Sequence, residues 1–375
     1  MTDKFLSRID EIAYRIGNKF EKLNIAILKK PASQIKEIKS KKPKNISLVY
    51  EQGKAYDNIR ESKDLIMAFC IGLFDEISDE LNNYAKTVYD TQDDIIKTVD
   101  LPKEYAVPYE DNHTAQEITR NAVNLTRNSF INIANTSVMS QEYISAIDKA
   151  VAAVTNGEDF DKVMSSTINE LSNKFTRVTY ASGITRRLDS AARMNIYEGA
   201  RRIQRQLDYE QAKRLGMDAV VISAHADCAP DHLEIQGQKF SLSEFDEINS
   251  TLHRPIGTLN CRHYEMYTFS YLDNPYSAEY VQALHDRSLE TIDINGKKVT
   301  RYKAEQMARA LETRMRYTLD RIQMSQQASN DINAEAQKSV FESQKAAYVK
   351  LCSQIGIRPD YRRIFVKGVD NYGYK

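Results

Sequence analysis

Apolar residues recur at the spacing of an α-helix through most of this 375-residue chain. The pattern holds for about a hundred residues from Thr114, as in SQEYISAIDKAVAAVTNG, where Ile144, Ile147 and Val151 share one face. It returns in RYKAEQMARALETRMRYTLDRIQM at 301–324. Only 13 glycines and 8 prolines interrupt the chain, which favours long helices over short strands and turns. The sequence therefore predicts a mainly α protein.

A different pattern occupies about 218–270. DAVVISA is a β-branched run of strand length, QGQKFSL offers a glycine turn into a second strand, and HYEMYTF alternates as a third strand would. This stretch predicts one small mixed α/β module. Farther along, Asn295–Gly296 lies between strand-like flanks and predicts a two-residue hairpin turn.

These patterns divide the chain into four consecutive regions. A multi-helix N-terminal region, 1–110, contains a basic stretch at 29–45 that we interpret as a linker between two helices. A helical domain is expected at 111–217 and the α/β module at 218–272. Residues 273–375 are expected to form the hairpin, long C-terminal helices and a basic tail.

The charge balance and cysteine content exclude several protein classes. Lys plus Arg equals Asp plus Glu, at 52 each, so no global charge attracts the chain to nucleic acid or membrane. The most apolar run, LIMAFCIGLF at 65–74, is too short to span a bilayer, so no membrane span is expected. The four cysteines, with a first segment unlike a signal peptide, indicate a reducing compartment and no disulfide framework.

The basic stretch at 29–45 has two interpretations. It is either a solvated linker or a contact surface for phosphate or an acidic partner. With the tail around Arg358, Arg362, Arg363 and Lys367, it would give the chain a DNA-contacting surface. The lysines concerned are Lys29, Lys30, Lys36, Lys39, Lys41, Lys42 and Lys44.

Histidines and cysteines gather in the α/β module, in SAHADCAPDHLEIQGQKF at 223–240 and NCRH at 260–263. Zinc favours thiolate and imidazole ligands, usually four in a tetrahedron. One interpretation is therefore a structural zinc site that joins the first strand of the module to the third. Its ligands would be Cys228, His232, Cys261 and His263, with His225 as an alternative ligand.

A buried polar turn without metal is the second interpretation. Asp227 and Asp231 would cap a helix that begins near Pro230, because proline suits the first helical position. The histidines would then hydrogen-bond the backbone, and the cysteines would be small core residues. This turn would also join the first strand to the third.

A catalytic centre is the third interpretation. A cysteine–histidine pair would act as nucleophile and base, or His225, Asp227 and His232 would hold a hydrolytic metal. The chain contains no G-x-S-x-G, H-E-x-x-H or phosphate-binding glycine loop. Cys261 and His263, facing the same way on one strand, need not come within hydrogen-bonding reach. We therefore predict that the protein is not an enzyme and requires no cofactor, the structural zinc aside.

The order of these segments resembles the phage minor capsid protein 2 family, which belongs with the Mu F-like head morphogenesis proteins. VVISAHADCAPDHLEIQGQKFSLSEF and IGTLNCRHYEMYTF are similar to the central motifs of the family. YASGITRRLDSAARMNIYEGARR precedes them, and INGKKVTRYKAEQMARALETRMR and QKAAYVKLCSQIGIRPDYRR follow, in the family's order. The resemblance covers roughly 115–366. Ala229 departs from it, since many relatives carry Arg or another polar residue there.

This resemblance implies a structural head protein of a tailed bacteriophage. Such a protein is synthesised in the bacterial host cytoplasm and lies in the virion, inside the head near the portal. It would take part in procapsid assembly, and in genome packaging or ejection, with the portal protein, other head proteins and packaged DNA as partners. We expect the helices of 1–217, including Leu65, Phe69 and Leu73, to contact those partners. The alternatives are a DNA-contacting internal head protein and a metal-dependent hydrolase at the 225–263 cluster.

Overall fold

The computed structural model is mainly α-helical with three small antiparallel sheets among its described residues, which confirms the predicted fold class. Its residues form two compact units, each assembled from three stretches of chain. The four consecutive regions expected from the sequence do not coincide with these units, because segments distant in sequence pack together. Unit 1 contains 1–13, 73–129 and 194–305, and unit 2 contains 14–72, 130–193 and 306–375. The structure describes residues 2–98, 107–138, 140–180, 183–226, 228–258 and 261–365.

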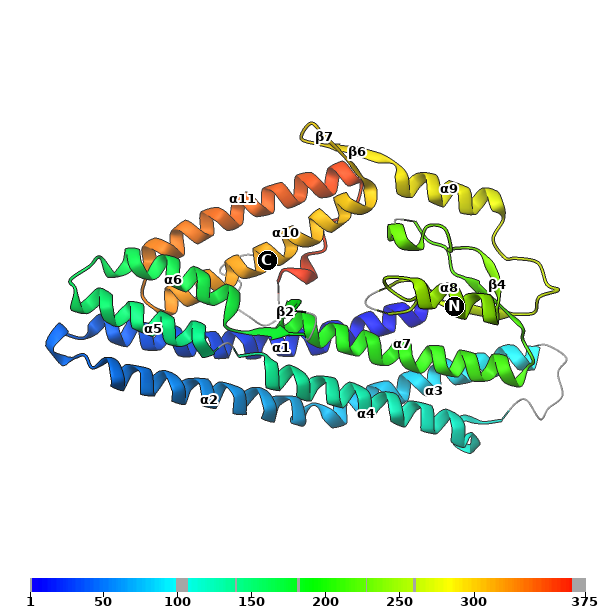
Figure 1. Ribbon diagram of the computed structural model, residues 1–375, viewed down its shortest axis with the longest axis horizontal. Helices are drawn as coiled ribbons and strands as arrows, with labels where there is room; N and C mark the ends of the chain where they lie inside the picture. Colours follow the sequence, from blue (N-terminus) through cyan, green and yellow to red (C-terminus); the bar gives the residue numbers. More distant parts are fainter. Residues whose placement is uncertain are drawn as a thin grey trace. The chain divides into compact units, whose positions relative to one another are not determined.

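Unit 2 is built on long helices. Within it, α5 packs against both α2 and α6, and α11 contacts α6 (Figure 1). The α11 helix is capped at its start by Asn330, whose side chain accepts a hydrogen bond from the Asn333 N–H, and at its end by Gly356 in a left-handed conformation. The elements that contribute to this unit are α1 (Thr2–Ser40), α2 (Leu48–Gly72), α5 (Ser140–Thr155), α6 (Phe160–Lys174), β1 (Arg177–Thr179), β2 (Thr185–Arg187), α10 (Arg301–Gln327), α11 (Asp331–Ile355) and the 3-10 turns Pro43–Asn45 and Tyr361–Arg363.

Helix α1 corrects the prediction of a linker at 29–45. The helix continues through Pro31 to Ser40, so only the remaining residues connect it to α2. An internal proline costs a helix about 3 kcal/mol. Burial of Ala32, Ile35 and Ile38, all fully enclosed in unit 2, offsets that cost, since these residues recur at helical spacing.

A buried cluster of six charged side chains lies inside unit 2. Arg187 donates hydrogen bonds to Glu21 at 2.7 and 2.8 Å and also pairs with Asp189 and Asp320. Burial disfavours the charged form of Asp189, but the guanidinium group of Arg316, together with neighbouring arginines, outweighs it and lowers the pKa of this carboxyl. The cluster contains three arginines and three carboxylates, so its formal charges cancel. Its members are Glu21, Arg187, Asp189, Arg193, Arg316 and Asp320.

Unit 1 combines helices with the predicted α/β module. Its α7 helix approaches α4 closely at Gly199, where a side chain would overlap the hydroxyl of Thr126. None of the described helices in either unit is long and apolar enough to cross a membrane. The elements that contribute to unit 1 are α3 (Phe74–Thr98), the 3-10 turn Tyr109–Asp111, α4 (His113–Thr136), α7 (Leu188–Arg214), β3 (Ala219–Ile222), the 3-10 turn Pro230–His232, β4 (Lys239–Ser241), α8 (Leu242–Thr251), β5 (Glu265–Thr268), α9 (Ala278–Leu289), β6 (Thr291–Ile294) and β7 (Lys297–Thr300).

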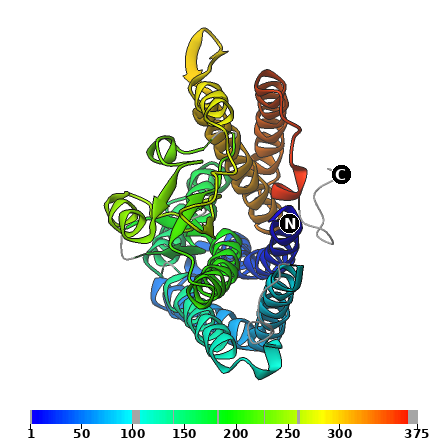
Figure 2. The same ribbon diagram turned by 90° about the vertical axis from the view of Figure 1, so that its right-hand side faces the viewer.

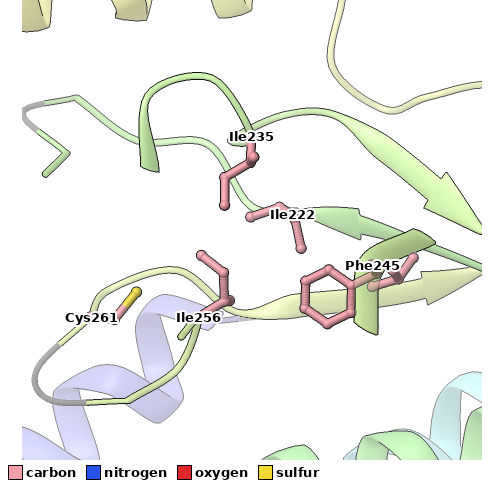
Figure 3. Packing of buried hydrophobic residues seen from close by; sticks show 6 residues of the cluster. Ile222, Ile235, Phe245, Ile256 and Cys261 are labelled. Atoms are coloured by element: carbon pink, nitrogen blue, oxygen red, sulfur yellow. The ribbon is translucent and has the colours of Figure 1, made fainter. Parts of the chain in front are cut away.

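The three predicted strands of the module form one antiparallel sheet in the order β4-β3-β5. Central strand β3 is buried along its whole length, with Val220 opposite both Phe240 and Tyr267. Helix α8 covers β3 and β4. It starts with a reciprocal capping box between Ser241 and Glu244. The hydrophobic core beneath is small, and Figure 3 shows most of its side chains converging. This core comprises Val220, Ile222, Ile235, Phe245, Ile256 and Cys261.

The predicted hairpin is present as β6 and β7. Asn295 and Gly296 both have positive φ, 56° and 82°, which is the requirement of the two-residue turn. Figure 2 shows the hairpin beyond the end of α9, away from the three-stranded sheet. It is thus a separate two-stranded sheet within unit 1.

Candidate metal centre

Two loops at one end of the three-stranded sheet bring predicted ligands together. His232 ends the 3-10 turn that follows β3, while Cys261 and His263 lie in the loop before β5. A hydrogen bond from the Ser223 N–H to the Tyr264 carbonyl, at 3.0 Å, holds the two loops in register. All three side chains are buried, with exposed fractions of 1% for His232, 5% for Cys261 and 3% for His263.

The local structure differs from the predicted one in two respects. Pro230 does start a helical turn, but a single 3-10 turn rather than a longer helix, because the chain must reverse at Gly237, where φ is +68°, to enter β4. Strand β5 begins at Glu265, so Cys261 and His263 lie in a loop and not on a strand. Neither difference separates the ligands.

Three ligand atoms lie close together. The Nδ1 atoms of His232 and His263 are 3.3 Å apart. The Sγ atom of Cys261 lies 3.5 Å from Nδ1 of His232 and 3.4 Å from Nδ1 of His263. The expectation that Cys261 and His263 need not come within reach of each other was therefore wrong, because the loop folds back on itself.

The outer nitrogens of both imidazoles face oxygen acceptors. Nε2 of His232 lies 2.7 Å from the carbonyl oxygen of Arg254. Nε2 of His263 lies 3.4 Å from Oε1 of Gln236, which also accepts from the backbone N–H of His225 at 3.2 Å. Since these oxygens can only accept, each Nε2 carries a hydrogen, and in the neutral rings both Nδ1 lone pairs point toward Cys261.

Other predicted site residues lie outside this group. The Cys228 thiol donates to the carbonyl of Ala229, and within the described residues the group that could hold a metal consists only of His232, Cys261 and His263. The His225 ring lies against that of His263, with centroids 4.2 Å apart and planes tilted by 32°, and is not one of the three. Asp227 is not among the described residues. Cys228 and His225 are therefore neighbours of the cluster in this structure.

Asp231 has a different role from the predicted helix cap. Its carboxylate accepts a hydrogen bond from Arg254 at 2.8 Å. This contact fixes the segment whose carbonyl meets His232. Gln236 and Arg254 were missed by the sequence analysis, since an amide and a backbone carbonyl carry no motif of their own.

Protonation in the cluster follows from burial and proximity. Burial, together with the neighbouring His225 and His232, lowers the pKa of His263 to about 2. Burial alone would lower the pKa of His232, but the contacts with Cys261 and the Arg254 carbonyl raise it. Burial acts to raise the pKa of Cys261, but the contacts with His232 and with the backbone of Gly257 and His263 together lower it. The cluster can therefore hold a cation, whether that cation is a proton or a metal ion.

The basic stretch is partly neutralised within unit 2. Lys30 pairs with Glu61 at 2.5 Å and Lys39 with Asp161 at 2.6 Å. Lys41 pairs with Glu37 and Glu51. In the tail, Arg362 and Arg363 pair with Asp360, and Lys367 is outside the described residues. The lysines that remain exposed are Lys29, Lys36, Lys42 and Lys44.

Comparison with known proteins identifies the family. Residues 50–350 match the family described as phage minor capsid protein 2, and this is more than half of the chain. The chain belongs to the phage minor capsid protein 2 family. As a member of that family it is a structural component of the phage virion, which confirms the predicted family. The match includes the whole Cys–His cluster and parts of both units. Neither the curated proteins nor the solved structures contain a match to the chain.

Proposed function

We propose that this minor capsid protein is associated with the portal, inside the phage head, and has a structural role in procapsid assembly. Membership of the family over residues 50–350 is the observation that carries this proposal. The mainly helical architecture supports it, because long helices offer extended faces to neighbouring subunits. Its partners are then the portal protein and other head proteins.

The exposed side of α2 is the surface that we assign to the portal contact. Of the residues first expected there, Leu73 is only 6% exposed and Phe69 packs on Phe20 with ring centroids 5.1 Å apart. Phe69 therefore stabilises unit 2, and Leu73 is buried in unit 1, whereas Leu65, at 40% exposed, remains accessible. A more exposed set comprises Val49 at 79%, Tyr56 at 60% and Ile71 at 53%. At 100° per residue, their spacing places them within about 60° of one another around α2.

Mass spectrometry of purified particles tests the head assignment. We expect the protein in a fixed low ratio to portal subunits, and its absence from particles would overturn the proposal.

Binding of the full chain to purified portal tests the exposed surface of α2. Val49→Ser/Tyr56→Ser/Ile71→Ser should weaken binding at least about tenfold, equivalent to 1.4 kcal/mol. The matched control is Leu125→Ser, which changes an apolar side chain of α4 that is 47% exposed. Equal binding by both variants would exclude the α2 surface.

Packaged DNA is a second candidate partner, supported by the four exposed lysines of the basic stretch. Phosphate contacts make the affinity fall with salt, with a slope of about −0.9 for each contact on duplex DNA. Replacement of Lys29, Lys36, Lys42 and Lys44 by Gln should reduce both affinity and slope. Binding that does not depend on salt, or no binding at all, would exclude this role.

A further inference from the structure

We infer that His232, Cys261 and His263 bind one zinc ion, through Nδ1, Sγ and Nδ1 respectively. Zinc–nitrogen bonds of about 2.0–2.1 Å and a zinc–sulfur bond of about 2.3 Å, at tetrahedral angles, separate two nitrogens by about 3.3 Å and nitrogen from sulfur by about 3.6 Å. The corresponding separations here are 3.3, 3.5 and 3.4 Å. The three atoms thus already form one face of a zinc tetrahedron.

The orientation of the rings supports the same conclusion. The Arg254 carbonyl and Gln236 Oε1 occupy the Nε2 side of each ring, so both Nδ1 lone pairs face the same point as the Cys261 sulfur. Such outer hydrogen bonds are the usual way in which a protein orients a metal-binding imidazole. Without a metal ion, a hydrogen on the Cys261 thiol or on Nδ1 of His232 can bridge only one pair of these three atoms at a time. A zinc ion binds all three at once.

Zinc has a structural role in this position. It joins the turn after β3 to the loop before β5, where His232 and Cys261 are 29 positions apart in sequence. Among the described residues, the core beside these loops has six buried members, on a sheet whose strands have three or four residues each. A core of that size gains substantially from a metal cross-link. The inference does not depend on the portal contact, because it concerns the stability of the module alone.

Within the described part of the chain the group that could hold a metal contains no fourth side chain, and the Cys228 thiol donates to the Ala229 carbonyl. The proposal therefore assigns three protein ligands, in place of the four expected from the sequence. This difference gives a direct test, because Cys228→Ser should keep the metal and Cys261→Ser should lose it. Cys352→Ser, a buried free cysteine of α11 in unit 2, is the control for the substitution itself.

The experiment is zinc determination on the purified full-length chain, produced with zinc in the medium. We expect about one zinc per chain in the wild type, Cys228→Ser and Cys352→Ser, and almost none in Cys261→Ser. His232→Gln should also lose it, because the glutamine amide can keep the bond to Arg254 while Nδ1 is removed. Loss of zinc in Cys228→Ser would show that Cys228 is a fourth ligand and that the three-ligand assignment is wrong. Retention in Cys261→Ser would overturn the site.

A second measurement uses the wild-type chain, so it tests the site even if the variants fail to fold. The wild-type chain is stripped with a chelator and titrated with Co²⁺, whose absorption reports tetrahedral geometry and a thiolate ligand. We expect a charge-transfer band, and a thermal midpoint that falls on stripping and recovers with Zn²⁺. A folded wild-type chain that binds neither ion would show that the cluster holds a proton instead. A chain without zinc could still be present in phage particles. Failure of the zinc proposal is therefore distinct from failure of the head assignment.

Discussion

Arg187 and Glu21 are 166 residues apart in sequence, yet two hydrogen bonds join their side chains inside unit 2. Both are nearly inaccessible, with side-chain exposure of 5% and 7%. Charges in such a place are stable only when every partner is present, because removal from water costs several kcal/mol per ion. The pair therefore fixes the register of α1 against β2, and its loss should destabilise the whole of unit 2.

Arg187→Met should lower the free energy of unfolding by about 3–5 kcal/mol, because it leaves Glu21 and Asp320 buried with too few positive charges. Equilibrium unfolding in urea measures the change. Arg60→Met is the control, since Arg60 pairs with Asp57 on the surface and should cost about 0–1 kcal/mol. Similar values for the two variants would show that the buried cluster adds no stability.

Asp208 of α7 should make stability depend on pH. Burial raises its pKa to about 7, although a hydrogen bond from Gln92 acts in the opposite direction. The folded chain then binds a proton more tightly than the unfolded chain between about pH 4 and 7, so the free energy of unfolding falls as pH rises, by at most about 1.4 kcal/mol per pH unit. Asp208→Asn should flatten this slope in urea titrations across that range. An unchanged slope would mean that Asp208 titrates normally.

Gly199→Ala should destabilise the protein by about 1–3 kcal/mol, because the new methyl group overlaps the Thr126 hydroxyl on α4. Thr126→Ala in the same chain should restore most of the loss. Gly53→Ala is the matched control, since nothing lies within 4 Å of the added carbon in the α2 helix. That change should stabilise by about 0.5–1 kcal/mol. Thermal denaturation of the three variants gives the comparison.

Ser241→Ala should cost about 1 kcal/mol and loosen the start of α8, since it removes one half of the capping box with Glu244. Hydrogen exchange of the Glu244 amide should be faster in the variant. Ser250→Ala, near the other end of the same helix, is the control, because it removes a hydroxyl that donates to the Glu247 carbonyl and does not cap the helix start. Protection that is equal in both variants would contradict a capping role.

Features that depend on neighbouring residues could be predicted from the sequence. The hairpin at Asn295–Gly296 follows from turn chemistry, and the three strands of the module follow from β-branched runs. Three of the four expected zinc ligands lie together because they are in two short motifs at the ends of paired strands.

Features that depend on contacts between distant parts of the chain could not be predicted from the sequence. Lysines and Pro31 made 29–40 look like a linker, because nothing in that stretch reveals that Ile35 and Ile38 are buried. The partner of Arg187 could not be chosen among 52 acidic residues. Cys228 and Cys261 are equally plausible ligands in sequence, and only the path of the backbone distinguishes them.

The three-part composition of unit 2 has a consequence for synthesis on the ribosome. Glu21 and Arg316 are 295 residues apart, so at translation rates of about 5–20 residues per second the acid emerges roughly 15–60 s before the base. Until then the Glu21 carboxylate has only one of its two arginine partners, because Arg187 emerges earlier, after 166 residues. In the nascent chain water must therefore still hydrate part of this carboxylate, and unit 2 closes only when the last helices are released.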